Sequence, residues 1–115
     1  MILSKLNAPH YTWGEQQNCD GWHLCKTNTL SMIEENMPPG TKEKLHYHER
    51  CQQVFYILSG QAHFKIEDRN YEINQGESIH ILPGLKHFIQ NNADQDLKFL
   101  VVSEPPSHGD RITLE

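Results

Sequence analysis

The chain has 115 residues and a formal net charge of −5, with 15 acidic and 10 basic side chains and the histidines counted as neutral. A chain of this length is expected to form one domain that buries a core without disulfide staples. The sequence has no cluster of lysine or arginine and no long apolar segment, so we expect neither a nucleic acid partner nor a membrane span.

The N-terminus and the cysteine count favour a cytoplasmic protein. The first residues lack the long apolar core of a signal peptide. The cysteines are odd in number and contain no C-x-x-C pair, which favours free thiols in a reducing compartment. These cysteines are Cys19, Cys25 and Cys51.

The first third of the chain has weak periodicity. Residues 1–20 are interpreted as an N-terminal arm of loops and turns, because Asn, Pro and Gly interrupt them repeatedly. Asp20-Gly21 is expected to form a turn. A weak alternation of apolar and polar residues predicts a strand over residues 22–26. A second strand is expected over residues 30–37, where a Pro-Pro-Gly sequence ends it.

The strongest strand signal is the apolar run that follows Gln53, because it is rich in β-branched and aromatic residues. Side chains alternate along a strand. One face should carry Gln53, Phe55 and Ile57, and the other Val54, Tyr56 and Leu58. Both faces are apolar, so the second must be covered by another sheet, by the N-terminal segment or by a second subunit. We therefore expect a homodimer.

The second half of the chain predicts more short strands. They are expected at residues 62–66, 71–73, 87–89 and 97–103. Residues 104–115 form a C-terminal tail that should begin extended, because it contains two prolines. Short strands bounded by Gly, Pro and Asn predict a single all-β domain, either a barrel or a sandwich, over residues 1–115.

Three histidines have the spacing of a metal site. His46 and His48 are two residues apart, so on a strand both imidazoles leave the same face. Gln53 begins the next strand, and His87 follows a Pro-Gly turn. Three neutral imidazoles and one amide oxygen, brought together by a sheet, would bind a divalent first-row metal.

These residues resemble the two motifs of the cupin superfamily of small β-barrels. The first motif is matched by Gly40, His46, His48 and Gly60, and the second by Gly76, Gly84, His87 and Asn91. Gln53 stands where the family has Glu, and Leu82 replaces a Pro that here follows one residue later. The resemblance implies a single jelly-roll-like β-barrel whose metal ligands point inward. With the alternation after Gln53, it places Phe55 and Ile57 in the pocket.

The Gln53 position changes the charge of the expected site. With Glu as fourth ligand a divalent metal would keep one positive charge, whereas with Gln it would keep two. This should weaken metal binding, strengthen the Lewis acid and favour an anionic ligand. Gln53 could instead hydrogen-bond a metal-bound water. Iron, nickel, zinc and manganese all remain compatible with these residue types.

Two functions follow from this reasoning. The first is a metal-dependent enzyme, an oxygenase or isomerase, that acts on a small anionic molecule. It needs an acid or base beside the metal, for which His80, Glu34 and Glu35 are the candidates. His80 could line the mouth of the pocket or lie in solvent, and the sequence does not decide which Glu faces inward. The alternative is a non-catalytic protein that binds or senses a small ligand.

Overall fold

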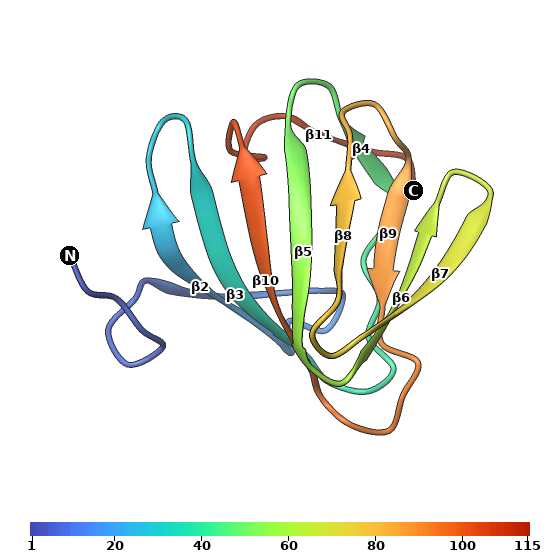
Figure 1. Cartoon of the computed structure of the whole chain (residues 1–115), viewed down its shortest axis with the longest axis horizontal. Coiled ribbons are helices and arrows are strands. Elements are labelled where there is room, and N and C mark those ends of the chain that lie inside the picture. Colours follow the sequence, from blue (N-terminus) through green and yellow to red (C-terminus); the bar gives the residue numbers. More distant parts are fainter.

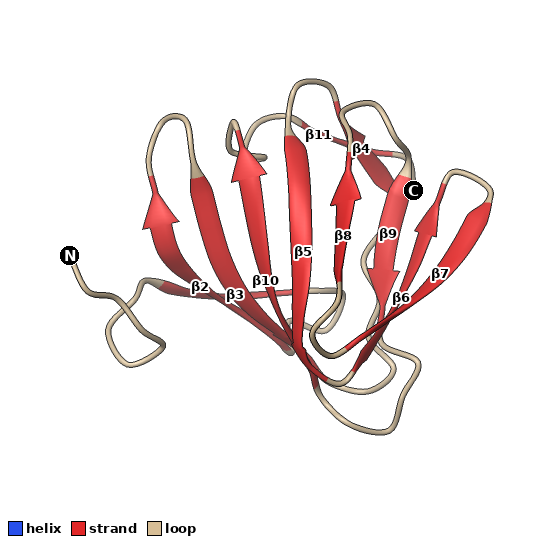
Figure 2. Cartoon of the chain, viewed as in Figure 1, coloured by secondary structure: helices blue, strands red, loops and turns tan.

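The computed structural model describes residues 1–115, and every regular element in it is a β-strand (Figures 1 and 2). The strands are β1 (His10–Trp13), β2 (Cys19–Lys26), β3 (Ser31–Met37), β4 (His46–His48), β5 (Gln52–Ser59), β6 (Gln61–Ile66), β7 (Arg69–Asn74), β8 (Ser78–Ile81), β9 (His87–Gln90), β10 (Leu97–Glu104) and β11 (Arg111–Thr113). The chain therefore contains no helix that could span a membrane. The predicted all-β class is confirmed.

The strands form two antiparallel sheets. One sheet has the order β1-β2-β3-β10-β5-β8, and the other has the order β11-β4-β9-β6-β7. The core lies between them. The ring centroid of Phe55 on β5 is 5.0 Å from that of Phe64 on β6 and 5.6 Å from that of Phe99 on β10. Because the two sheets are not joined by strand pairing, the expected closed barrel is not confirmed, and the fold consists of two facing sheets.

Strand β5 has the predicted alternation. Gln53, Phe55 and Ile57 are 7%, 3% and 0% exposed, so they face the interior. Val54 and Tyr56 point outward and are 38% and 43% exposed, so no segment of this chain fully covers the outer face of β5. The homodimer that would cover this face stays a prediction.

The N-terminal segment differs from its predicted form. β1 lies within the residues that were expected to form loops, and it pairs with β2 so that Tyr11 is opposite Gly21. Asp20 and Gly21 are therefore part of a strand and not a turn. The glycine is needed for packing, because a Cβ at this position would lie 2.2 Å from Cζ of Tyr11. The missing side chain thus lets the Tyr11 ring lie against the strand.

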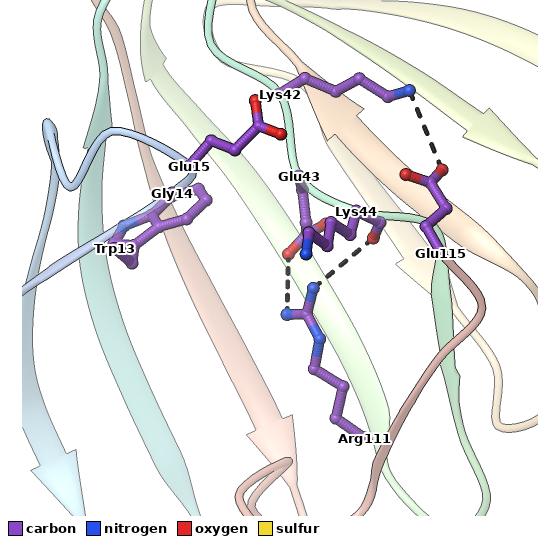
Figure 3. Close-up of a pocket in the computed structure, with 8 residues that line it drawn as sticks. All are labelled: Trp13, Gly14, Glu15, Lys42, Glu43, Lys44, Arg111 and Glu115. Carbon is purple, nitrogen blue, oxygen red and sulfur yellow. Dashed lines mark hydrogen bonds and ion pairs between the residues drawn. The ribbon is translucent and has the colours of Figure 1, made fainter.

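The C-terminal tail also contains a strand that the sequence did not predict. β11 pairs with β4, with Arg111 opposite His48. Asp110, just before β11, is buried and accepts three backbone hydrogen bonds, from the N–H groups of Glu49, Arg50 and Cys51 at 3.2, 3.0 and 2.9 Å. These contacts fix the tail beside β4, and Figure 3 shows the Arg111 side chain directed toward Glu43.

Candidate metal centre

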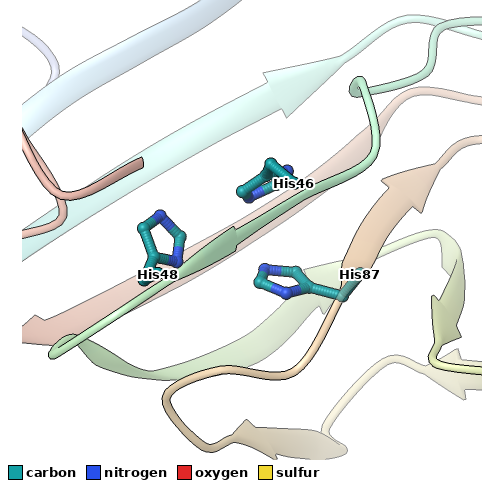
Figure 4. Close-up of side chains that lie close together, drawn as sticks. All are labelled: His46, His48 and His87. Carbon is teal, nitrogen blue, oxygen red and sulfur yellow. The ribbon is translucent and has the colours of Figure 1, made fainter. Parts of the chain in front are cut away.

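The three histidines predicted as metal ligands lie together inside the molecule (Figure 4). His46 and His48 share the inner face of β4, and His87 begins β9, where it is paired in register with His46. All three are at most 4% exposed. One ring nitrogen from each lies within 4.8 Å of the others, which is close enough to hold one metal ion. We call these residues the histidine cluster.

Hydrogen bonds define which ring nitrogen is free. Nδ1 of His46 is 2.7 Å from the Lys44 carbonyl oxygen, and Nδ1 of His87 is 2.8 Å from the Leu85 carbonyl oxygen. A carbonyl oxygen only accepts, so each Nδ1 carries the hydrogen and each Nε2 keeps its lone pair. Nε2 of His87 is buried and has no hydrogen-bond partner. A metal ion would satisfy it, so the cluster fits a bound metal.

Burial keeps the histidine cluster uncharged at neutral pH. The pKa values of His46 and His48 are each lowered to about 4, mainly because burial removes the imidazoles from water. The pKa of His87 is also lowered, again mainly by burial. Metal ions compete with protons for imidazole, so these low pKa values leave the ring nitrogens available to a metal over the physiological pH range.

Gln53 extends the same site from the opposite sheet. Its Nε2 donates to the Ser103 hydroxyl at 3.0 Å, while its Oε1 is buried and has no partner. Gln53 lines a cavity of about 460 Å³ together with His46 and His48; we call this the metal cavity. An amide oxygen without a partner suits either a metal or a metal-bound water. Its role as the fourth ligand stays a prediction.

Two of the residues proposed for the pocket lie elsewhere. Phe55 lines the metal cavity, but Ile57 packs wholly within the core and does not reach it. His80 is exposed on β8, in register with outward-facing Val54, and its Nε2 is 2.9 Å from Oε1 of Gln52. It therefore lies on the outer face of the sheet and does not line the cavity.

The two adjacent glutamates on β3 face opposite ways. Glu34 is paired with Lys5 at 3.0 Å and does not line the metal cavity, whereas Glu35 does. The carboxylate of Glu35 accepts a hydrogen bond of 2.7 Å from the Tyr11 hydroxyl. Burial is the main cause that raises the pKa of Glu35 to about 8, so this carboxyl group is largely protonated at neutral pH. It provides a titratable proton in the cavity wall.

Several residues that line the cavity were not identified from the sequence, among them Tyr11, Glu43 and Arg111. Glu43 precedes β4, and burial raises the pKa of its carboxyl group, while Arg111 lies 3.4 Å from its Oε2. Glu43 could have been suspected only from its position three residues before His46. Tyr11 and Arg111 belong to short strands without periodicity, so no local signal marks them.

Comparison with known proteins gives a consistent family. A model of the cupin domain matches residues 33–103. An uncharacterized protein of Methanocaldococcus jannaschii is 36% identical over 86 residues, which are 74% of this chain and 69% of that protein. An oxalate-binding protein of Thermotoga maritima is 35% identical over 66 residues, 57% of this chain and 54% of that protein, so the match spans about half of its length.

A solved structure shows the same fold. The crystal structure of a predicted oxalate decarboxylase from Thermotoga maritima superposes with a TM-score of 0.82 and covers 92% of this chain and 100% of that chain. The sequence identity is 23%, so this likeness concerns the fold alone.

Proposed function

Because the chain belongs to the cupin domain family, whose model spans residues 33–103, we propose that it binds a divalent transition metal at the histidine cluster and a small carboxylate anion at that metal. The observation that carries this proposal is the convergence of the three imidazoles, with buried Nε2 of His87 and Oε1 of Gln53 both lacking a partner. Iron, nickel, zinc and manganese are the candidate metals, since imidazole and amide oxygen suit each of them.

The neutral ligand set favours an anion. Three uncharged imidazoles and an amide leave the whole double charge of a divalent ion uncompensated in a buried site, and such a charge is costly without a counter-ion. The oxalate-binding relative from Thermotoga maritima supports a carboxylate as that counter-ion. Oxalate can chelate a metal through two oxygens, so it is the first ligand to test.

The carboxyl group of Glu35 supports a second candidate function, which is catalysis. A carboxyl group with a pKa near 8 on the cavity wall, held by the Tyr11 hydroxyl at 2.7 Å, can hold or deliver a proton at neutral pH. When bound, the metal would polarise a carbonyl or carboxylate oxygen of the ligand. Together these groups suit an isomerase or oxygenase. A purely binding protein would use the same metal and would not need the proton of Glu35.

The test begins with the metal. Elemental analysis of the purified protein should find about one metal ion per chain, as one three-histidine cluster implies, and His87→Ala should lose it. His80→Ala is the matched control, because it removes an exposed imidazole outside the cavity and should leave metal content unchanged. Equal metal content in all three proteins would place the metal elsewhere and refute the proposed site.

Ligand binding is tested on the metal-loaded protein. Calorimetry should detect oxalate binding to the loaded protein and none to the metal-free protein, while glycerol, a neutral polyol, should not bind. Conversion of ligands is then followed by NMR with wild type and Glu35→Gln. Turnover that is lost in Glu35→Gln, with oxalate affinity retained, would support an enzyme. Binding without turnover of any ligand would favour the non-catalytic alternative.

A further inference from the structure

Arg111 is a charged residue of the metal cavity that the proposed function leaves unexplained. It begins β11 and is opposite His48 in the pairing of β11 with β4. Its side chain is 41% exposed and lines both the metal cavity and an adjoining second cavity of about 580 Å³. The Arg111 side chain is therefore partly open to solvent and contributes to the walls of both cavities.

The hydrogen bonds of this guanidinium group are long. Nη1 lies 3.4 Å from Oε2 of Glu43, and Nη2 lies 3.5 Å from the carbonyl oxygen of Lys44 (Figure 3). Charge-assisted bonds between arginine and carboxylate are usually about 2.7–2.9 Å, and a guanidinium has five N–H donors in a planar fork. Some N–H donors of the guanidinium group therefore make no strong hydrogen bond, and they can donate to a further carboxylate without breaking a strong contact.

The charge of Arg111 lies next to the proposed metal site. Arg111 is opposite His48 in the strand pairing, and it lines the metal cavity together with His46, His48 and Glu35. An anion in the metal cavity is therefore within range of the arginine charge as well as that of the metal.

The backbone of Arg111 is fixed before any ligand binds. Asp110 holds the preceding peptide through three backbone hydrogen bonds, and Arg111 itself is paired within β11 and β4. A residue placed by two independent sets of contacts loses little backbone freedom on binding. The tail residues Ser107 and His108 also line the metal cavity, so the tail forms one of its walls.

We propose that Arg111 binds a second carboxylate of a ligand whose first carboxylate is held at the metal. This deepens the proposed function and rests on it, since it names the substrate class as a dicarboxylate with its two ends separated by several bonds. Oxalate, whose two carboxylates are adjacent, would fill only part of a cavity of about 460 Å³. A longer dianion can reach both cationic groups.

The experiment compares two ligands on nickel-loaded protein by calorimetry. 2-Oxoglutarate and 2-oxovalerate have the same five-carbon chain and the same chelating 2-oxo acid end, and they differ only in a distal carboxylate against a methyl group. Wild type should bind 2-oxoglutarate about tenfold or more tightly than 2-oxovalerate, the size of one charge-assisted contact. The ratio of the two affinities is the readout, because any general effect on metal or fold cancels in it.

Three variants test whether Arg111 is the source of that affinity ratio. In Arg111→Met it should fall to about threefold or less, and Arg111→Lys, which keeps the charge but not the fork, should be intermediate. Arg69→Gln removes an exposed arginine from β7 and should leave the ratio at the wild-type value. If Arg111→Met does not fold, Arg111→Lys carries the test.

The outcomes separate the two proposals. If oxalate binds in a metal-dependent manner but the ratio in the Arg111 variants equals that of wild type, Arg111 does not bind the second carboxylate and the inference is wrong, while the proposed function stands. If the nickel-loaded protein binds neither oxalate nor either 2-oxo acid, the proposed function fails and the inference fails with it.

Discussion

Replacement of Asp110 by alanine tests whether the C-terminal tail is a structural part of the site. The carboxylate accepts backbone N–H groups of Glu49, Arg50 and Cys51 at 3.2, 3.0 and 2.9 Å, and the residue is only 8% exposed. A hydrogen bond to a charged group contributes about 1.5–3 kcal/mol, and bonds that share one acceptor are not additive. Water can partly replace them here, so we expect Asp110→Ala to lower the free energy of unfolding by about 2–4 kcal/mol.

The loss should depend on pH. Burial alone would raise the pKa of Asp110, but the three backbone donors and the nearby Arg50 outweigh it and hold the pKa below its ordinary value. A lowered pKa means that this stabilisation is present above the unfolded-state pKa, about 3.9, and is lost as the pH falls through the folded-state value. Wild type and Asp110→Ala should therefore differ fully at pH 7 and converge in strongly acidic solution.

Two assays measure the effect. Urea unfolding gives the free energy of unfolding, and limited trypsin digestion with mass spectrometry reports cleavage after Arg111, inside β11. The variant should be cleaved there faster than wild type. Asp94→Ala, which removes an exposed carboxylate from a loop, is the control and should match wild type in both assays. If Asp110→Ala is as stable and as resistant as wild type, the three hydrogen bonds do not hold the tail.

Four further predictions follow from the described contacts. Gln53→Glu should tighten metal binding about tenfold or more, since the Ser103 hydroxyl can donate to the new carboxylate; unchanged affinity in a metal titration would mean that residue 53 does not touch the metal. Gly21→Ala should displace Tyr11 and cost about 1–3 kcal/mol in urea unfolding. Glu35→Gln should gain stability relative to wild type as the pH rises from about 4.5 toward 8. The pKa of Glu35 is raised to about 8 in the folded state, so the wild-type carboxyl group contributes its full stability only below its unfolded-state pKa of about 4.5. This contribution to the free energy of unfolding is lost as the pH rises to about 8. Light scattering of wild type should give about twice the chain mass of 13.4 kDa, as expected for a dimer. Tyr56→Lys, on the outer face of β5, should give the mass of one chain. A monomeric wild type would contradict the dimer.

The sequence predicted those parts of the fold in which apolar residues alternate. β5 and β10 lie close to their predicted positions, and a period of two placed Gln53 and Phe55 on one face of β5. The inward direction of that face followed from the motif resemblance, which makes Gln53 face the metal. β1 and β11 were missed because they are three or four residues long and are defined by pairing with distant segments. A strand of that length has no periodicity of its own to detect.

The choice between Glu34 and Glu35 shows a second limit. Met32 and Ile33 are both apolar, so the residues before the two glutamates favour neither face. Only the packing of β3 against β2 and β10 places Glu35 inside, with Met37 wholly buried on the same face. Sequence alone could therefore nominate the pair but could not choose the member that lines the cavity.

The charges around the metal cavity favour a ligand that carries two negative charges. Glu43 is offset by Arg111 at 3.4 Å, and Glu35, with a pKa of about 8, is largely protonated at neutral pH. The remaining predicted ligands are neutral imidazoles and an amide, so the double charge of a bound metal would stay uncompensated. A ligand that brings two negative charges, one at the metal and one at Arg111, balances this double charge, whereas a neutral polyol balances none of it.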